Sequence, residues 1–82
     1  SRDPNVRNPA RARGYAERAV AATGGQDARA LQALSAAQAA DGSLAEAART
    51  ARSAAAVARA RGEMAEADAL EYRALSYESV RK

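Results

Sequence analysis

Small and apolar residues recur at helical spacing along four separate stretches of the chain. Within each stretch, positions three and four residues apart are apolar, which is the periodicity of one helix face. The expected helices cover residues 9–23, 27–41, 44–61 and 63–79. The expected apolar faces, helix by helix, are Ala12, Ala16 and Ala19, with Tyr15 and Val20 beside them; Leu31, Leu34 and Gln38, with Ala30, Ala33 and Ala37 flanking; Leu44, Ala47, Ala48, Ala51, Ala54, Ala55 and Ala58; and Met64, Ala67, Leu70, Ala74 and Tyr77. Because no stretch alternates strictly or is rich in β-branched residues, the pattern predicts an all-α fold.

Capping residues and glycines indicate where these helices begin and end. Asn8 precedes Pro9, and an asparagine cap followed by proline at the first helical position is a typical helix start. Asp27 is expected to cap the second helix. Ser43 and Glu46 match the Ser-x-x-Glu capping box, in which each side chain accepts a hydrogen bond from a free backbone amide. The breaks between helices fall at Gly24-Gly25, Gly42 and Gly62.

Turns this short place consecutive helices antiparallel to one another. We therefore expect one helical domain over residues 8–82, preceded by a polar lead-in at residues 1–7. Alanine supplies 26 of the 39 hydrophobic residues, which leaves five Leu, four Val, three Tyr and one Met as larger apolar side chains. Stability is expected to come from helix propensity and close helix approach, since burying a methyl group contributes little.

Positive charge is densest near the amino-terminal end. The net charge is +3, with 12 arginines and one lysine against ten carboxylates. The basic cluster, on and before the first helix, consists of Arg7, Arg11, Arg13 and Arg18. One interpretation is a solvated face, and the other is contact with nucleic acid or another polyanion, whose affinity would fall steeply with salt. No apolar run is long enough to span a membrane.

Most residue types used in catalytic and metal sites are missing. The chain has no His and no Cys, so the usual general base, thiol nucleophile and zinc ligands are absent. Glu63, Glu66 and Asp68 lie near one another, but the helix dipole already favours acids at a helix start. We therefore expect no enzyme activity, no cofactor and no resident metal.

The first and third helices repeat one arrangement of small residues at a distance of 35 positions. The matching stripes are Ala12, Ala16 and Ala19 and, in the third helix, Ala47, Ala51 and Ala54. A period near 34 built as helix–turn–helix is typical of the tetratricopeptide repeat (TPR), in which small residues let two helices pack closely. The chain therefore resembles the TPR family.

One complete TPR-like unit covers residues 28–61, and both flanks extend the resemblance. Family positions are matched by Leu34, Ser35, Gly42, Leu44-Ala45-Glu46-Ala47, Ala51 and Ala54. The unit departs from the family at Leu31, where Trp is usual, at Gln38, where Tyr is usual, and in lacking a closing Pro. Residues 8–12 resemble the second helix of a preceding unit, and residues 62–77 resemble the helix that closes many bacterial TPR arrays. A generic Ala-rich bundle and a related helical repeat are the alternatives.

The resemblance implies a right-handed α-solenoid fragment that binds a protein partner. In TPR proteins the first helix of each unit lines a concave groove, which holds an extended peptide or a partner helix. By alignment the groove residues are Arg29, Gln32, Ala36, Ala39, Asp68, Tyr72 and Leu75. The Lys and Asn clamp of chaperone-tail-binding members is not matched. We expect Tyr72 to contact a partner and Tyr77 to pack internally.

A solenoid normally needs about three units for stability, and this chain holds about two. We therefore expect the native protein to continue upstream, with the fragment either marginally stable or associating through the exposed face of its first helix. Three hypotheses follow. The favoured one is a non-catalytic interaction or assembly scaffold for a protein, a peptide or the rest of its parent chain. The others are a helical domain whose basic first helix contacts an anionic partner, and a self-associating structural cap.

Overall fold

The computed structural model describes residues 9–81, which form four α-helices and no strand. The helices are α2 (Pro9–Ala22), α3 (Ala28–Ala40), α4 (Leu44–Ala60) and α5 (Met64–Arg81). Each lies within two residues of its expected range, so the all-α prediction is confirmed. The expected cap at Asn8, the lead-in at residues 1–7 and Arg7 lie outside the described residues. Over residues 9–81, no helix has the length and apolar character needed to cross a bilayer.

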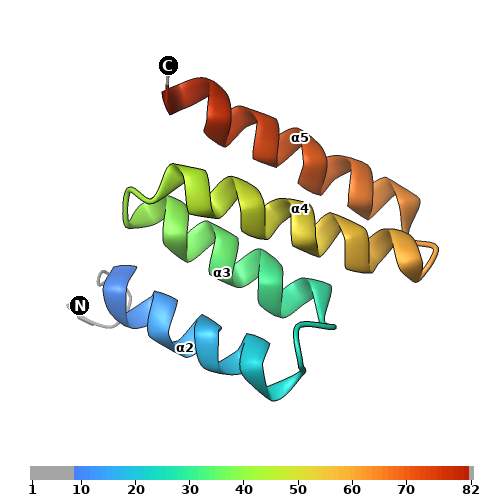
Figure 1. Ribbon diagram of the computed structural model, residues 1–82, viewed down its shortest axis with the longest axis horizontal. Helices are drawn as coiled ribbons and strands as arrows, with labels where there is room; N and C mark the ends of the chain where they lie inside the picture. Colours follow the sequence, from blue (N-terminus) through green and yellow to red (C-terminus); the bar gives the residue numbers. More distant parts are fainter. Residues whose placement is uncertain (1–8, 82) are drawn as a thin grey trace, which may run out of the picture.

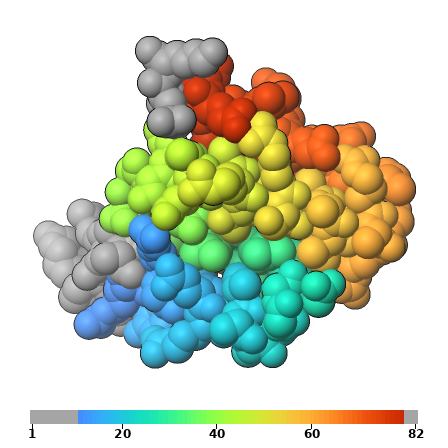
Figure 2. All heavy atoms as spheres, viewed as in Figure 1, coloured from blue at the N-terminus to red at the C-terminus, as the bar shows by residue number. Residues whose placement is uncertain are grey.

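The helices follow one another across the molecule in chain order (Figure 1). α2 and α5 occupy opposite edges, with α3 and α4 between them, and the space-filling view in Figure 2 shows the same order. Consecutive helices pack together, whereas helices that are not adjacent in the chain barely touch. In the described structure, α3 and α4 therefore each have two neighbours, and α2 and α5 each have one.

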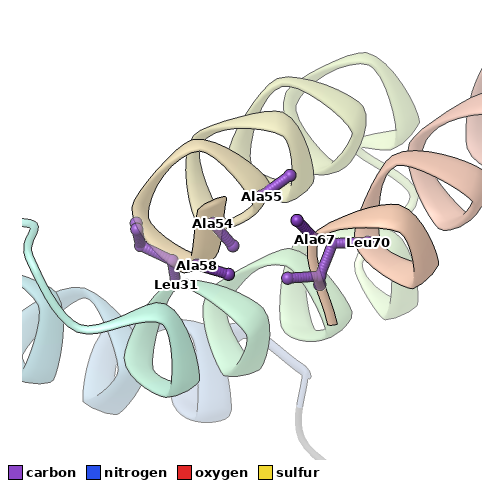
Figure 3. Close-up of a cluster of buried hydrophobic side chains, with 6 residues drawn as sticks. All are labelled: Leu31, Ala54, Ala55, Ala58, Ala67 and Leu70. Atoms are coloured by element: carbon purple, nitrogen blue, oxygen red, sulfur yellow. The ribbon is translucent and has the colours of Figure 1, made fainter. Parts of the chain in front are cut away.

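The core is built on the alanines of α4. Six of them are at most 1% exposed, namely Ala47, Ala48, Ala51, Ala54, Ala55 and Ala58. Leu31 from α3 and Leu70 from α5 both pack against this alanine face, as Figure 3 shows. Because a methyl group occupies little space, both neighbouring helices approach α4 closely. The expected buried stripe of α4 is confirmed at all six of these positions.

Two buried polar side chains of α3 join it to α4. The Ser35 hydroxyl donates a 2.8 Å hydrogen bond to the carbonyl oxygen of Ala47. The Thr50 hydroxyl donates a 2.7 Å hydrogen bond to Oε1 of Gln38. A buried polar group without a partner costs roughly 1–3 kcal/mol, so these bonds favour one position of α3 on α4 over others.

The helix ends combine one side-chain cap with two glycine caps. The Asp27 carboxylate accepts a 3.0 Å hydrogen bond from the backbone N–H of Arg29, which confirms the expected cap of α3. Gly42 and Gly62 have φ of 86° and 80°, the left-handed conformation that follows many helix ends. Beyond them, the N–H of Ser43 donates to the carbonyl of Gln38 at 2.8 Å.

The expected capping box of α4 is wrong. The Ser43 side chain makes no cap hydrogen bond. Glu46 instead accepts a 3.0 Å hydrogen bond from Nη2 of Arg13, and Nη1 of Arg13 lies 3.5 Å from the Ser43 hydroxyl. A charge-assisted bond to a guanidinium is stronger than one to a neutral amide. The two side chains therefore hold α2 instead of capping α4.

Three alanines of the expected apolar faces and their flanks are exposed, and each lies where no helix covers it. Ala16 of α2 is buried, but Ala12 and Ala19 are exposed, as is Ala33 of α3. In the described residues nothing packs on that side of α2 and α3.

At the other edge, α5 buries Ala67, Leu70 and Ala74 and half-buries Tyr77, as expected. Met64 was expected to be buried with them but is 51% exposed. It is the first residue of α5, and helical side chains lean toward the helix N-terminus. Its side chain therefore lies beside the turn at Gly62, where it lines a depression together with Arg29 and Gln32 of α3.

Candidate functional site

An apolar groove lies between α2 and α3. It has a volume of about 600 Å³ and is lined by Ala12, Tyr15, Ala16, Ala33, Ala36 and Ala37. We call it the α2–α3 groove. Five of its six lining residues are alanines, so its walls are methyl groups that leave room for larger side chains. No charged residue lines this groove.

Tyr15 forms one side of this groove. Its side chain is 53% exposed, and the guanidinium of Arg18 lies 5.2 Å from its ring centroid. That distance is within the range of a cation–π contact. Arg18 therefore places a positive charge beside the groove.

The seven residues expected to line one partner groove do not lie on one surface. Arg29 and Gln32 line a second depression, of about 740 Å³, with Met64 and Glu66 at the start of α5. Ala36 lies in the α2–α3 groove instead, and Ala39 is half-buried on α3.

The three α5 residues of that set lie on a different side of the molecule. Oδ1 of Asp68 is 3.7 Å from Nη2 of Arg59 on α4, whereas Glu66 lines the same depression as Arg29. Residues two apart on a helix point in nearly opposite directions, so Asp68 is turned away from α3. Tyr72 and Leu75 follow Asp68 at i+4 and i+7 and share its side. The spacing identified a common face, but the packing of α5 on α4 determines which neighbour that face meets.

We call the stripe formed by Asp68, Tyr72 and Leu75 the outer face of α5, and we include Met64 at its start, where the stripe meets the depression lined by Arg29 and Gln32. Tyr72 is 73% exposed, Leu75 is 58% exposed and Met64 is 51% exposed. With Tyr15, they are the large hydrophobic side chains that lie exposed in the part of the chain the structure describes. Periodicity had assigned Met64 to the core, so its place on this face was not foreseen. The clue was its position at the first residue of the helix.

The expected basic cluster does not form a set of available cations. The Arg13 guanidinium lies 3.1 Å from Glu17, 3.1 Å from Asp41 and 3.0 Å from Glu46, and the side chain is 27% exposed. The hydrogen bond to Glu17 raises the pKa of Arg13, and Glu46 and Asp41 raise it further. Arg13 therefore connects α2 to the turn between α3 and α4, and its charge is already balanced by carboxylates. Arg18 contacts Tyr15, as described above.

Two further ion pairs hold α5 against α4. Both terminal nitrogens of Arg52 donate hydrogen bonds to the Glu78 carboxylate, and Nη2 lies 2.8 Å from Oε1. In the second pair, Nη2 of Arg59 lies 2.7 Å from Oε2 of Glu71. These hydrogen bonds raise the pKa of both arginines. They lie on the same side of α5 as Asp68, next to the outer face.

Within residues 9–81, no group of three acidic side chains is placed to hold a metal ion. No protein-family model matches the chain, and no curated protein or solved structure is significantly similar to it.

Proposed function

We propose that this chain is a non-catalytic, TPR-like interaction module whose α2–α3 groove binds an amphipathic helix. One observation carries the proposal. Ala47 and Ala54 of α4 are fully buried, whereas Ala12 and Ala19, which stand 35 positions earlier on α2, are exposed. Two equivalent stripes of alanine thus differ in whether a helix covers them.

The helix that covers the α4 stripe is α3, and its contacts indicate what would cover α2. Leu31 packs on the α4 alanines, while Ser35 bonds to the carbonyl of Ala47. A helix seated in the α2–α3 groove would place its own bulky side chains on Ala12, which lines the groove, in the same way. Helix-in-groove recognition of this kind uses apolar anchors at i, i+3, i+4 and i+7.

A catalytic role has less support. The chain has no His or Cys, and the buried hydroxyl of Ser35 is committed to a backbone carbonyl. Binding to a polyanion also has less support, because three carboxylates surround Arg13, at the centre of the basic cluster.

The proposal is tested with a peptide that copies α3. We would titrate ¹⁵N-labelled chain with a synthetic peptide of residues 26–42 and follow backbone amide shifts by NMR. Saturable shifts are expected around Ala12, Tyr15, Ala33 and Ala36. A peptide in which Leu31 and Leu34 are replaced by Ser should bind at least tenfold more weakly, since it lacks the apolar anchors.

A matched pair of variants locates the binding surface. Ala36→Glu places a charge in the groove and should abolish the shifts, whereas Ala56→Glu, on the exposed side of α4, should leave them unchanged. Equal binding by both variants, or no saturable binding to the native chain at millimolar peptide, would rule out the groove as a helix-binding site.

A further inference from the structure

The molecule has two uncovered faces, one at each edge. At the α2 edge is the α2–α3 groove, whose walls are mostly alanine. At the opposite edge is the outer face of α5, which presents Met64, Tyr72 and Leu75 to solvent. One face thus offers space between small side chains, and the other offers large side chains with nothing packed against them in the described residues.

The outer face of α5 corresponds to the face of α3 that α4 covers. Ala37 of α3 and Ala74 of α5 both face the preceding helix, and they stand 37 positions apart. The same offset relates two triplets with i, i+4, i+7 spacing: Leu31, Ser35 and Gln38 on α3, and Asp68, Tyr72 and Leu75 on α5. The first triplet is buried beneath α4, and the second is exposed.

Compared with the packed pair α3 and α4, each edge of the described structure is missing one helix, and the missing helix differs between the two edges. α5 lacks the alanine-striped helix that α4 provides for α3. α2 has that alanine stripe, at Ala12, Ala16 and Ala19, but lacks a helix in the position that α3 takes on α4. The outer face of α5 in one copy could therefore pack on the alanine stripe of α2 in another copy, as α3 packs on α4 within the chain.

The charges of the two edges are also complementary. α2 carries three arginines and one glutamate, and α5 carries four carboxylates and two arginines. Arg13, Glu71 and Glu78 are already paired within the chain, so the complementarity between the two faces rests on Asp68 and Arg18. Asp68 lies in the middle of the outer face with its side chain 75% exposed. Arg18 lies beside the groove, against Tyr15. Opposite charges on the two faces favour this pairing over the pairing of either face with itself.

We infer that the occupant of the α2–α3 groove is helix α5 of a second copy of this chain, so that copies associate head to tail. This inference rests on the proposed function, because it names the helix that the groove binds. The two contacting surfaces are different, so each dimer retains one free groove and one free outer face. Such heterologous contacts extend into open chains unless the rotation closes a ring.

Sedimentation equilibrium of the full 82-residue chain provides the first test. The average mass should rise with concentration past twice the 8.5 kDa chain mass. Ala36→Glu should block the groove, and Leu75→Glu should block the outer face, so each variant alone should remain monomeric. Mixed together, the two variants should form a one-to-one dimer, since each retains the surface that the other has lost. Ala56→Glu, on the exposed side of α4, should associate like the native chain.

The outcomes separate this inference from the proposed function. A native chain that stays at 8.5 kDa at millimolar concentration while still binding the α3 peptide would overturn head-to-tail association and leave the groove intact. Association that survives Leu75→Glu but not Ala36→Glu would show two grooves facing each other, and would also overturn it. Circular dichroism of each variant checks that it folds, and Ala33→Glu with Tyr72→Glu serves as a second pair if either first variant does not.

Discussion

At the residue scale, Arg13 shows how one side chain can connect three elements. Its guanidinium contacts Glu17 on its own helix, Asp41 in the following turn and Glu46 at the start of α4. α2 has only one neighbour in the described structure. Of Ala12, Ala16 and Ala19 it buries only Ala16, and its Val20 packs partly buried against the core. The position of α2 therefore depends strongly on this one arginine.

We expect Arg13→Gln to loosen α2 and lower the melting temperature by a few degrees, because three carboxylates lose a shared cation. Arg13→Lys should recover only part of the loss, since an ammonium cannot present the planar fork of a guanidinium. The raised pKa means that the charged contribution is complete at neutral pH and is lost only as pH rises through that value in strong alkali.

The measurement is a thermal melt combined with amide hydrogen exchange in α2. Arg49→Gln is the control, because Arg49 is exposed and contacts no carboxylate among residues 9–81. Equal melting temperatures for the two Gln variants would show that the Arg13 contacts do not hold α2.

The packing around position 51 leaves no room for a side chain larger than that of alanine. Ala51 is fully buried between α4 and its neighbours, whereas Ala56, on the same helix, is exposed. Ala51→Leu should lower the free energy of unfolding by ~1–3 kcal/mol through overpacking. Ala56→Leu should change it little, and so should Tyr72→Ala at concentrations where the chain is monomeric. Urea denaturation measures all three, and a larger effect at position 56 would mean that the buried face of α4 is wrongly assigned.

At the element scale, Asp27 and Ser43 both stand at the N-cap position of a helix, but only one of them caps its helix with its side chain. Asp27 caps α3 through its side chain, whereas Ser43 has the residue type of a cap but contacts Arg13 instead. Asp27→Ala should therefore lower the free energy of unfolding by about 1 kcal/mol, as loss of an N-cap does. Ser43→Ala should cost less. Denaturant melts of the two variants compare them, and the opposite order would restore the capping-box interpretation of Ser43.

The sequence predicted the helices well because each has strong periodicity and a marked end. It predicted the buried face of α4 because that helix has neighbours on both sides, so every small residue of its stripe is covered. It failed at Ala12 and Ala19, since the same stripe on α2 is uncovered and spacing does not record what lies opposite. The residues expected to line one groove are separated for a related reason. The burial of Ala67, Leu70 and Ala74 against α4 sets the rotation of α5, and that rotation directs Asp68 away from α3.

At the scale of the whole molecule, the linear order of the helices determines how the fold shares its stability. Each helix depends on its neighbours in the chain, so the edge helices are supported from one side only. Where each helix contacts only its neighbours in the chain, stability is approximately the sum of a term for each helix and a term for each interface between neighbours. A helix docked in the α2–α3 groove would add one such interface, and it would stabilise α2, which has only one neighbouring helix in the described structure.

The alanine core of α4 has a thermal consequence for the whole chain. Unfolding raises the heat capacity because apolar surface becomes hydrated, and methyl groups expose less of it than larger side chains do. Scanning calorimetry of the monomeric chain should therefore give a heat-capacity increase below the ~12–15 cal/mol/K per residue of ordinary domains. A value within that range would contradict this expectation. A small increase flattens the curve of stability against temperature, so this protein should lose little stability on cooling and should resist cold denaturation.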